Sequence, residues 1–218
     1  EAVFHAVFGE RDRANALLDR YQTIVDELND PAARAALALA RSVAAYQRGA
    51  WASSFKWSSR CMEYLAGLRA NLAWTRSTAV VYRMAAAGHL GRLDEILRVL
   101  PRELAHARAR GDLHAVLHLS LGMPVALDAI LDRPETGIDH ARAVWTDSPG
   151  RHYAQLQIHA LRTEAELALV ASDGEVARNA GRKGWALAKG AETKRIVVVR
   201  LSACELAIRC ELSGASGP

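Results

Sequence analysis

DPAARAALALARSVAAYQRGAW, residues Asp30 to Trp51, is the stretch that decides the fold of this chain. Asp30 followed by Pro31 predicts a helix start, because aspartate accepts hydrogen bonds from the first free N–H groups and proline fits the first turn. The alanine and leucine residues that follow are strong helix formers. Gly49 ends the run, and Trp51 opens a second amphipathic segment. The stretch therefore predicts a helical hairpin.

The same succession of an apolar stretch, a glycine and a second amphipathic stretch recurs along the chain. The glycines, separated by 40, 42, 46 and 37 residues, are Gly9, Gly49, Gly91, Gly137 and Gly174. A period of this size is typical of stacked helical hairpins, in which neighbouring units cover each other's apolar faces. No segment alternates convincingly with period two. We therefore predict an all-α fold, a right-handed solenoid of about five antiparallel hairpins with units of about 40 residues.

The predicted helices divide into two sets. The first helices of the hairpins are expected at 31–48, 71–87, 112–131, 151–171 and 192–212. The second helices are expected at 10–28, 51–67, 92–110, 138–146 and 175–189. We expect residues 1–218 to form a single helical-repeat domain that belongs to a longer protein. Its centre, near 122–150, should be irregular, because Pro124 interrupts a helix and 147–150 has the composition of a loop.

Composition narrows the class of protein. Half of the residues are apolar, which suffices for a sizeable core, and no run of 18 apolar residues predicts a membrane span. No export signal is visible, so a cytoplasmic location is expected. The chain has three cysteines, Cys61, Cys204 and Cys210, and no C-x-x-C pair. An odd number without metal-binding spacing predicts buried thiols rather than disulfides or a zinc site.

The turn at residues 46–51 resembles one found in a known family. In Tyr46-Gln-Arg-Gly49-Ala-Trp51 the glycine is followed two residues later by an aromatic and five residues later by the small Ser54. This resembles the inter-helix turn of tetratricopeptide repeats, although the units here exceed the roughly 34 residues of that family. Gly9 matches in part. The chain is also similar to helical regions of bacterial STAND ATPases of the maltose-regulator type and serine/threonine kinases. That similarity implies a sensor or docking module tethered to a catalytic domain.

Arginines spaced by seven residues mark two neighbouring first helices. The two rows are Arg34, Arg41 and Arg48, and Arg69, Arg76 and Arg83. Side chains seven apart form a row that drifts only about 20° per heptad. First helices line the concave groove of tetratricopeptide-like stacks, so the rows could form a cationic trough for carboxylates or phosphates. The alternative is a solvated polar face.

Four large aromatic residues lie around the second and third predicted hairpins. They are Trp57, Tyr64, Trp74 and Tyr82. At helical spacing such residues belong to the core, whereas any that line a groove would anchor a bound peptide.

No catalytic motif accompanies these features. His114 and His118 have a spacing that can share a metal, but no H-E-x-x-H and no phosphate-binding loop is present, so we expect no metal, cofactor or enzymatic activity. The favoured function is a non-catalytic interaction or sensor module that binds a protein or peptide, with an acidic partner suited to the basic groove. The pI near 9.2 leaves nucleic-acid binding by a helical repeat as one alternative. An all-α enzyme with an unrecognised active site is the other.

Overall fold

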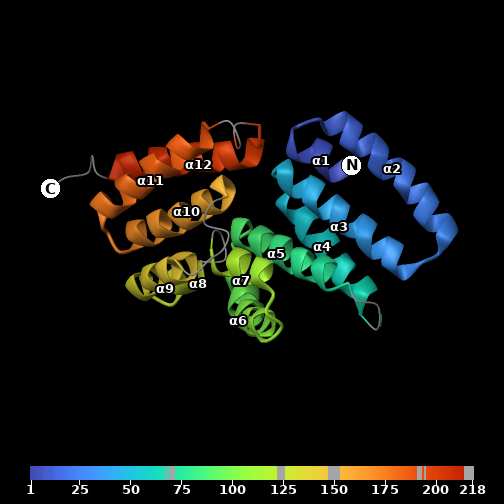
Figure 1. Cartoon of the computed structure of the whole chain (residues 1–218), viewed down its shortest axis with the longest axis horizontal. Coiled ribbons are helices and arrows are strands. Elements are labelled where there is room, and N and C mark those ends of the chain that lie inside the picture. Colours follow the sequence, from blue (N-terminus) through green and yellow to red (C-terminus); the bar gives the residue numbers. More distant parts are fainter. Residues whose placement is uncertain are drawn as a thin grey trace. The chain divides into compact units, whose positions relative to one another are not determined.

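The computed structural model describes residues 1–66, 68, 72–121, 126–146, 153–190, 193 and 195–213. Over these residues the chain forms twelve α-helices and no strand, which confirms the all-α prediction (Figure 1). Contacts between Cα atoms divide the chain into two compact units, Glu1–Ala115 and Val116–Pro218. A single domain over residues 1–218 stays a prediction. None of the helices in the described residues is long and apolar enough to cross a lipid bilayer.

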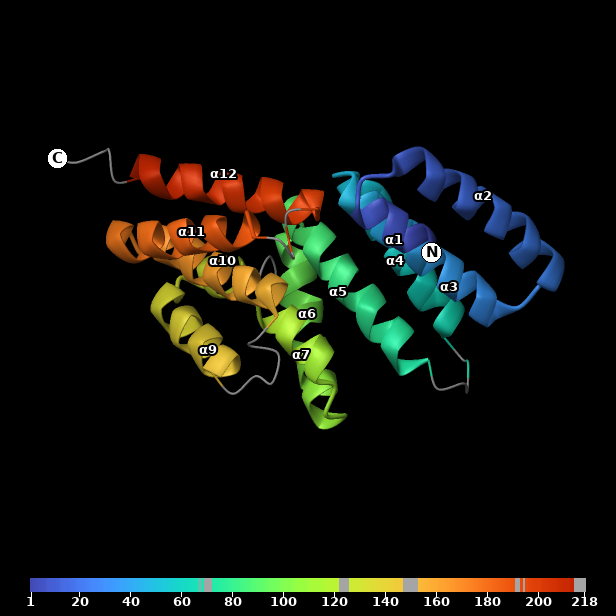
Figure 2. The same cartoon turned by 45° about the horizontal axis from the view of Figure 1, so that its top comes forward.

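The first unit is a succession of antiparallel helices. They are α1 (Ala2–Val7), α2 (Arg11–Leu28), α3 (Pro31–Gln47), α4 (Trp51–Leu65), α5 (Ala73–His89) and α6 (Leu93–Ala109). Each helix packs on the next, and α3 also packs on both α1 and α5 (Figure 2). Helix α3 consequently lies at the centre of this unit.

The second unit is arranged around α10. Its helices are α8 (Ala126–Ile130), α9 (Pro134–Thr146), α10 (Ala154–Val170), α11 (Gly174–Ala188) and α12 (Val197–Ser213). Helix α7 (Leu113–Ser120) begins in the first unit and ends in the second. Helices α9, α11 and α12 all pack on α10, and α12 also packs on α11 (Figure 1).

The stretch Asp30–Trp51 folds as its sequence predicts. The Asp30 carboxylate accepts hydrogen bonds from the backbone N–H groups of Ala32 and Ala33, at 3.2 and 3.0 Å. This cap satisfies two of the donors that a helix start leaves without intrahelical partners. Pro31 occupies the first turn of α3.

The residues of the predicted turn motif join three helices. Trp51 stacks on the His89 ring of α5 with centroids 3.9 Å apart, and the Tyr46 hydroxyl lies 3.2 Å from His89 Nε2. Ser54 is fully buried, and its carbonyl oxygen accepts a hydrogen bond from Ser42 Oγ at 3.0 Å. The small side chains allow α3 and α4 to approach closely, while the aromatic group attaches the hairpin to α5.

Six turns between helices share one hydrogen-bond pattern. Gly9, Gly49, Gly91 and Gly111 have positive φ values of 83°, 73°, 64° and 65°, and Asp132 and Ser172 adopt the same conformation at 53° and 60°. In each turn this residue donates to the carbonyl three residues earlier, and the next N–H donates to the carbonyl five residues earlier. Such bonds satisfy the carbonyls at a helix end. The turn at Gly111 joins α6 to α7, and the other five turns are 40, 42, 41 and 40 residues apart.

Two of the five glycines that defined the period in the sequence do not form turns. Gly137 lies inside α9, which begins at Pro134 rather than at 138. A Cβ at Gly137 would lie 2.8 Å from Asp128 Cβ and from Leu167 Cδ1, so glycine is needed there for close packing. Gly174 is the first residue of α11. The predicted start of the first of these helices at 138 was therefore wrong, whereas the predicted start of the second at 175 differs from the observed one by a single residue. The predicted break at Pro124 and the loop at 147–150 lie outside the described residues.

Helix α3 is apolar on two faces, and both are buried. Leu37 and Ala44 pack with residues of α1 and α2 in one cluster. Leu39 and Val43 pack with residues of α4 and α5 in another. A helix with two apolar faces needs covering helices on both sides, and within the first unit α3 has them.

Candidate functional site

The arginine row on α3 lies against the preceding helix. Arg41 makes an ion pair with Asp19 at 3.3 Å and donates a hydrogen bond to the Leu18 carbonyl at 3.4 Å. Arg48 donates to the Asn15 side-chain oxygen at 2.6 Å, and Arg34 donates to that of Asn29, just after α2, at 2.6 Å. The row therefore joins α3 to α2 and to the turn that follows α2.

The arginine row on α5 lies against the following helix, α6. Arg76 pairs with Glu103 at 2.9 Å, and Arg83 pairs with Glu95. Both carboxylates are buried, with 5% and 12% of their side chains exposed. A carboxylate removed from water needs a cation or several hydrogen bonds. These arginines supply that charge. Arg69 lies outside the described residues.

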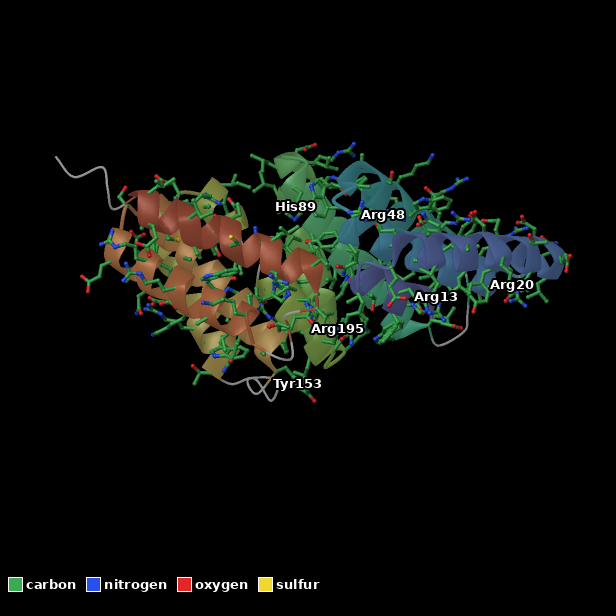
Figure 3. The ribbon with its side chains drawn as sticks, turned by 90° about the horizontal axis from the view of Figure 1, so that it is seen from above. Arg13, Arg20, Arg48, His89, Tyr153 and Arg195 are labelled. Atoms are coloured by element: carbon green, nitrogen blue, oxygen red, sulfur yellow. The ribbon has the colours of Figure 1, made fainter. Side chains whose placement is uncertain are left out.

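The two rows thus occupy different helix contacts, α3 with α2 and α5 with α6, instead of facing one another. Heptad spacing by itself does not specify what an arginine contacts. Arg13 and Arg20 on α2 are also seven residues apart, yet both are exposed to solvent (Figure 3). The cationic trough stays a prediction.

Three of the four aromatic candidates belong to the core. Trp57, Tyr64 and Tyr82 pack against the buried cluster formed by α3, α4 and α5. The Arg41 guanidinium lies 5.4 Å from the centre of the Trp57 ring. Burial raises the pKa of the Tyr82 hydroxyl, and a hydrogen bond with Gln47 partly offsets this. Trp74 differs from the others, since 66% of it is exposed.

The sequence analysis overlooked an exposed apolar face on α12. The residues of this face, exposed by 41 to 65%, are Val197, Leu201, Ile208 and Leu212. The opposite side of the helix carries the buried residues Val199, Ala203, Leu206 and Cys210. The signal was present in the sequence, because apolar residues recur every three or four positions on both sides of 197–212. We call the first set, together with Cys204, the open face of α12.

Cys204 corrects the expectation that all three cysteines are buried. Cys61 and Cys210 are buried, but Cys204 is only partly so. Burial raises the pKa of Cys61 to about 11 and also raises that of Cys210. Because Cys204 is the most accessible of the three thiols, it is the one best placed to react with reagents from solvent.

A pocket of about 550 Å³ lies between α9 and α11 above α10. Both α9 and α11 pack on α10, but among the described residues they make no comparable contact with each other. The residues that line the pocket are Ala141, Arg142, Trp145, Gln157, Ala160, Leu161, Glu164, Lys183, Ala186 and Leu187. Its surface is mainly apolar, and of its polar residues Arg142 and Lys183 are exposed to solvent.

The polar groups of the pocket carry a small positive excess. Arg142 donates a hydrogen bond to Glu164, which neutralises one pair of charges. Among the described residues Lys183 has no ion-pair partner, and it is exposed. Gln157 contributes an amide group that can donate and accept.

His118 and His159 in the second unit pack against each other. The rings of His118 and His159 meet edge to face, with centroids 5.8 Å apart. Burial, together with the charge of Arg162, lowers the pKa of His159 to about 4. In the part of the chain that the structure describes, no three histidine, cysteine or acidic side chains form a metal-binding group.

Comparison with known proteins yields no assignment for this chain: no family model, no curated protein and no solved structure matches it.

Proposed function

We propose that this chain is a protein-interaction module, a solenoid of helical hairpins that binds an amphipathic helix of a partner on the open face of α12. The observation that carries the proposal is the exposure of Leu201, Ile208 and Leu212 on the side of α12 opposite its core. Contiguous apolar surface of this kind is characteristic of sites that bind other proteins. A helix with i, i+4 and i+7 apolar anchors is a matching occupant.

The solenoid part of the proposal rests on the turns. Of the six turns with the same hydrogen bonds, five follow each other at intervals of 40 to 42 residues, and the sixth, at Gly111, lies between two hairpins of this period. In this period α1, α3, α5, α8 and α10 are the first helices of their hairpins, and α12 occupies the next first-helix position. Helix α3 packs on α1, and α12 packs on α10, as stacked first helices do.

The difference between α3 and α12 supports the binding surface. Both helices have two apolar faces, and α3 is covered on both by other helices. Within the described residues α12 packs on α10 and α11 with one face only. A helix laid on the open face would give α12 the same burial that α3 has.

The arginine rows favour this surface over a basic groove. Arg76 and Arg83 are committed to buried carboxylates, so they offer little charge to an acidic peptide or to nucleic acid. We place the module beside a catalytic domain of a cytoplasmic signalling protein, with a cytoplasmic protein or peptide as partner. This placement rests on the similarity of the long, degenerate, arginine-, alanine- and leucine-rich helical units to the helical regions of bacterial signalling ATPases and kinases.

A displayed library of amphipathic helices tests the proposal. Helices selected on the natural chain should bind a Leu201→Asp/Ile208→Asp variant at least about 100-fold more weakly, because two buried leucine-sized contacts are lost and charges are placed in the contact. Leu113→Asp, which changes an exposed leucine on α7, is the matched control and should leave affinity unchanged.

Cys204 provides a second measurement in the same experiment. Alkylation of this thiol should slow when a selected helix is bound, because Cys204 lies within the open face. Helices that bind both variants equally, or that leave the alkylation rate of Cys204 unchanged, would show that the open face is not the binding surface.

A further inference from the structure

We propose that the pocket between α9, α10 and α11 binds a small organic anion with a flat apolar body, such as an aromatic carboxylate. This site is separate from the open face of α12 and does not depend on it. Three features carry the inference: the shape of the pocket, the chemistry of its walls and the charge at its edge.

The pocket has the size and lining of a small-molecule site. Its volume, about 550 Å³, lies within the range of roughly 300 to 1,000 Å³ common for such sites. The residues facing it from the three helices include the small Ala141, Ala160 and Ala186. Larger side chains at these positions would have filled the space between α9 and α11. The gap is therefore a consequence of side-chain size on three separate helices.

The walls suit an aromatic or otherwise flat ligand. Trp145 of α9 stands on one side, Leu187 of α11 on the other, and Leu161 of α10 lies at the base. An aromatic ring can stack on the Trp145 indole and bury its edges against the two leucines. Because the surface is mainly apolar, most of the binding free energy would come from removing this area from water.

The charge at the edge selects an anion. Of the three charged side chains that line the pocket, Arg142 and Glu164 are paired, which leaves the ammonium group of Lys183. Gln157 can donate a further hydrogen bond from its amide, and the Arg142 guanidinium retains N–H groups beyond the one it gives to Glu164. A carboxylate would find donors and a positive charge here, whereas a cation would meet Lys183.

Binding of 1-naphthoate and of uncharged 1-naphthalenemethanol to the 218-residue chain tests the inference. Both should shift the indole N–H resonance of Trp145, assigned with a Trp145→Phe variant, and naphthoate should bind more tightly. Lys183→Met should weaken naphthoate about three- to fivefold, the value of one exposed charge contact, and leave the alcohol unaffected. Lys56→Met, on an exposed lysine of α4, is the matched control and should change neither.

Ala186→Trp separates specific binding from general adhesion of an apolar probe. Ala186 is exposed at the pocket edge, so a tryptophan there should fill the pocket without disturbing the core and abolish binding of both compounds. An unchanged unfolding temperature would establish that this variant is folded. The inference is overturned if neither compound shifts the Trp145 resonance at millimolar concentration, or if Ala186→Trp binds both as the natural chain does.

Discussion

The two compact units treat their buried polar groups in opposite ways. The first unit buries two carboxylates, Glu95 and Glu103, and places an arginine from the neighbouring helix against each. The second unit partly buries the imidazole of His159, and the pKa of this ring is lowered to about 4, so it is neutral near pH 7. Its ion pair between Arg182 and Glu211 lies at an exposed surface. We therefore expect the stability of the first unit to fall when an arginine beside Glu95 or Glu103 is removed. We expect the stability of the second unit to fall when His159 gains a proton.

Removing Arg76 should have the largest effect. Arg76→Met leaves the Glu103 carboxylate with only the more distant Arg102, at 3.6 Å. A buried charge that loses its partner is strongly destabilising. Because Arg76 is one-third exposed, we expect a smaller loss of unfolding free energy than for a fully buried pair, about 2–3 kcal/mol. Urea denaturation measures this loss. The double variant Arg76→Met/Glu103→Leu should recover most of it. A single variant as stable as the natural chain would contradict the structural role of this pair.

Acidification should destabilise the second unit through His159. Its pKa is lowered in the folded state from 6.5 to about 4, so below pH 6.5 the unfolded chain binds more protons. The stability contributed by neutral His159 is complete above pH 6.5 and is lost as the pH falls toward 4. Between pH 7 and pH 5 we expect a loss of about 1–2 kcal/mol.

Two histidine variants isolate this contribution. His159→Phe should reduce the pH dependence of the unfolding free energy by that amount, whereas His106→Gln, at an exposed site on α6, should not. Equal slopes for the natural chain and His159→Phe between pH 7 and pH 5 would exclude His159 as the source.

Removing Arg83 should cost less than removing Arg76. Glu95 retains Arg98, whose guanidinium lies 2.6 Å from it, so the carboxylate stays paired. Arg83→Met also loses the contact with the Phe55 ring, 5.2 Å from the guanidinium. We expect a loss of about 1–2 kcal/mol in chemical denaturation. A loss greater than that of Arg76→Met would mean that Arg98 does not compensate.

Exchanging turn residues between the units should have small effects of opposite sign. Gly49→Ser places a side chain at a φ of 73° and should cost about 1 kcal/mol. Ser172→Gly relieves the same strain at a φ of 60° and should stabilise by about 0.5 kcal/mol. Thermal unfolding of the two variants measures both. Changes of the same sign would show that the two turns are not equivalent.

The row on α3 should be the least sensitive. Arg41 pairs with Asp19, whose side chain is 75% exposed, and such pairs contribute about 0–1 kcal/mol. Arg41→Met keeps an apolar chain over Trp57 and should lose about 0.5 kcal/mol. Arg20→Met changes an exposed arginine of α2 and should leave the free energy of unfolding unchanged. Equal losses for Arg41→Met and Arg76→Met would remove the distinction between the two rows.

Local features of the sequence predicted local features of the fold. Asp30 and Pro31 marked the start of α3, and the turn at Gly49 with Trp51 and Ser54 was identified from its spacing. The helix bounds in the first unit differ from prediction by only one or two residues, because caps and left-handed turns are decided by residues adjacent in the chain. Gly137 could not be interpreted correctly in this way, because it is required by close packing against Asp128 and Leu167. Leu167 is distant in the chain, and local sequence does not reveal that contact.

The candidate sites were much harder to predict. The heptad spacing predicted which arginines share a helix face. It did not reveal that Glu95 and Glu103 of α6 pair with the arginines of α5. The pocket beside Trp145 requires three helices to be placed first. The open face of α12 could have been found, since its apolar residues recur on both sides of the helix, but its exposure depends on which helices pack there.

By itself the sequence determined that the chain is helical, where most helices begin and end, and which residues share a face. These properties follow from backbone sterics, capping and the period of the α-helix, which act over a few residues. Only the tertiary structure decided which face meets which neighbour. Helix packing places Arg76 against a buried carboxylate, whereas Arg20 stays solvated. Within the described residues, no helix covers the open face of α12. Burial depends on residues that are distant in the chain, and no local pattern specifies them.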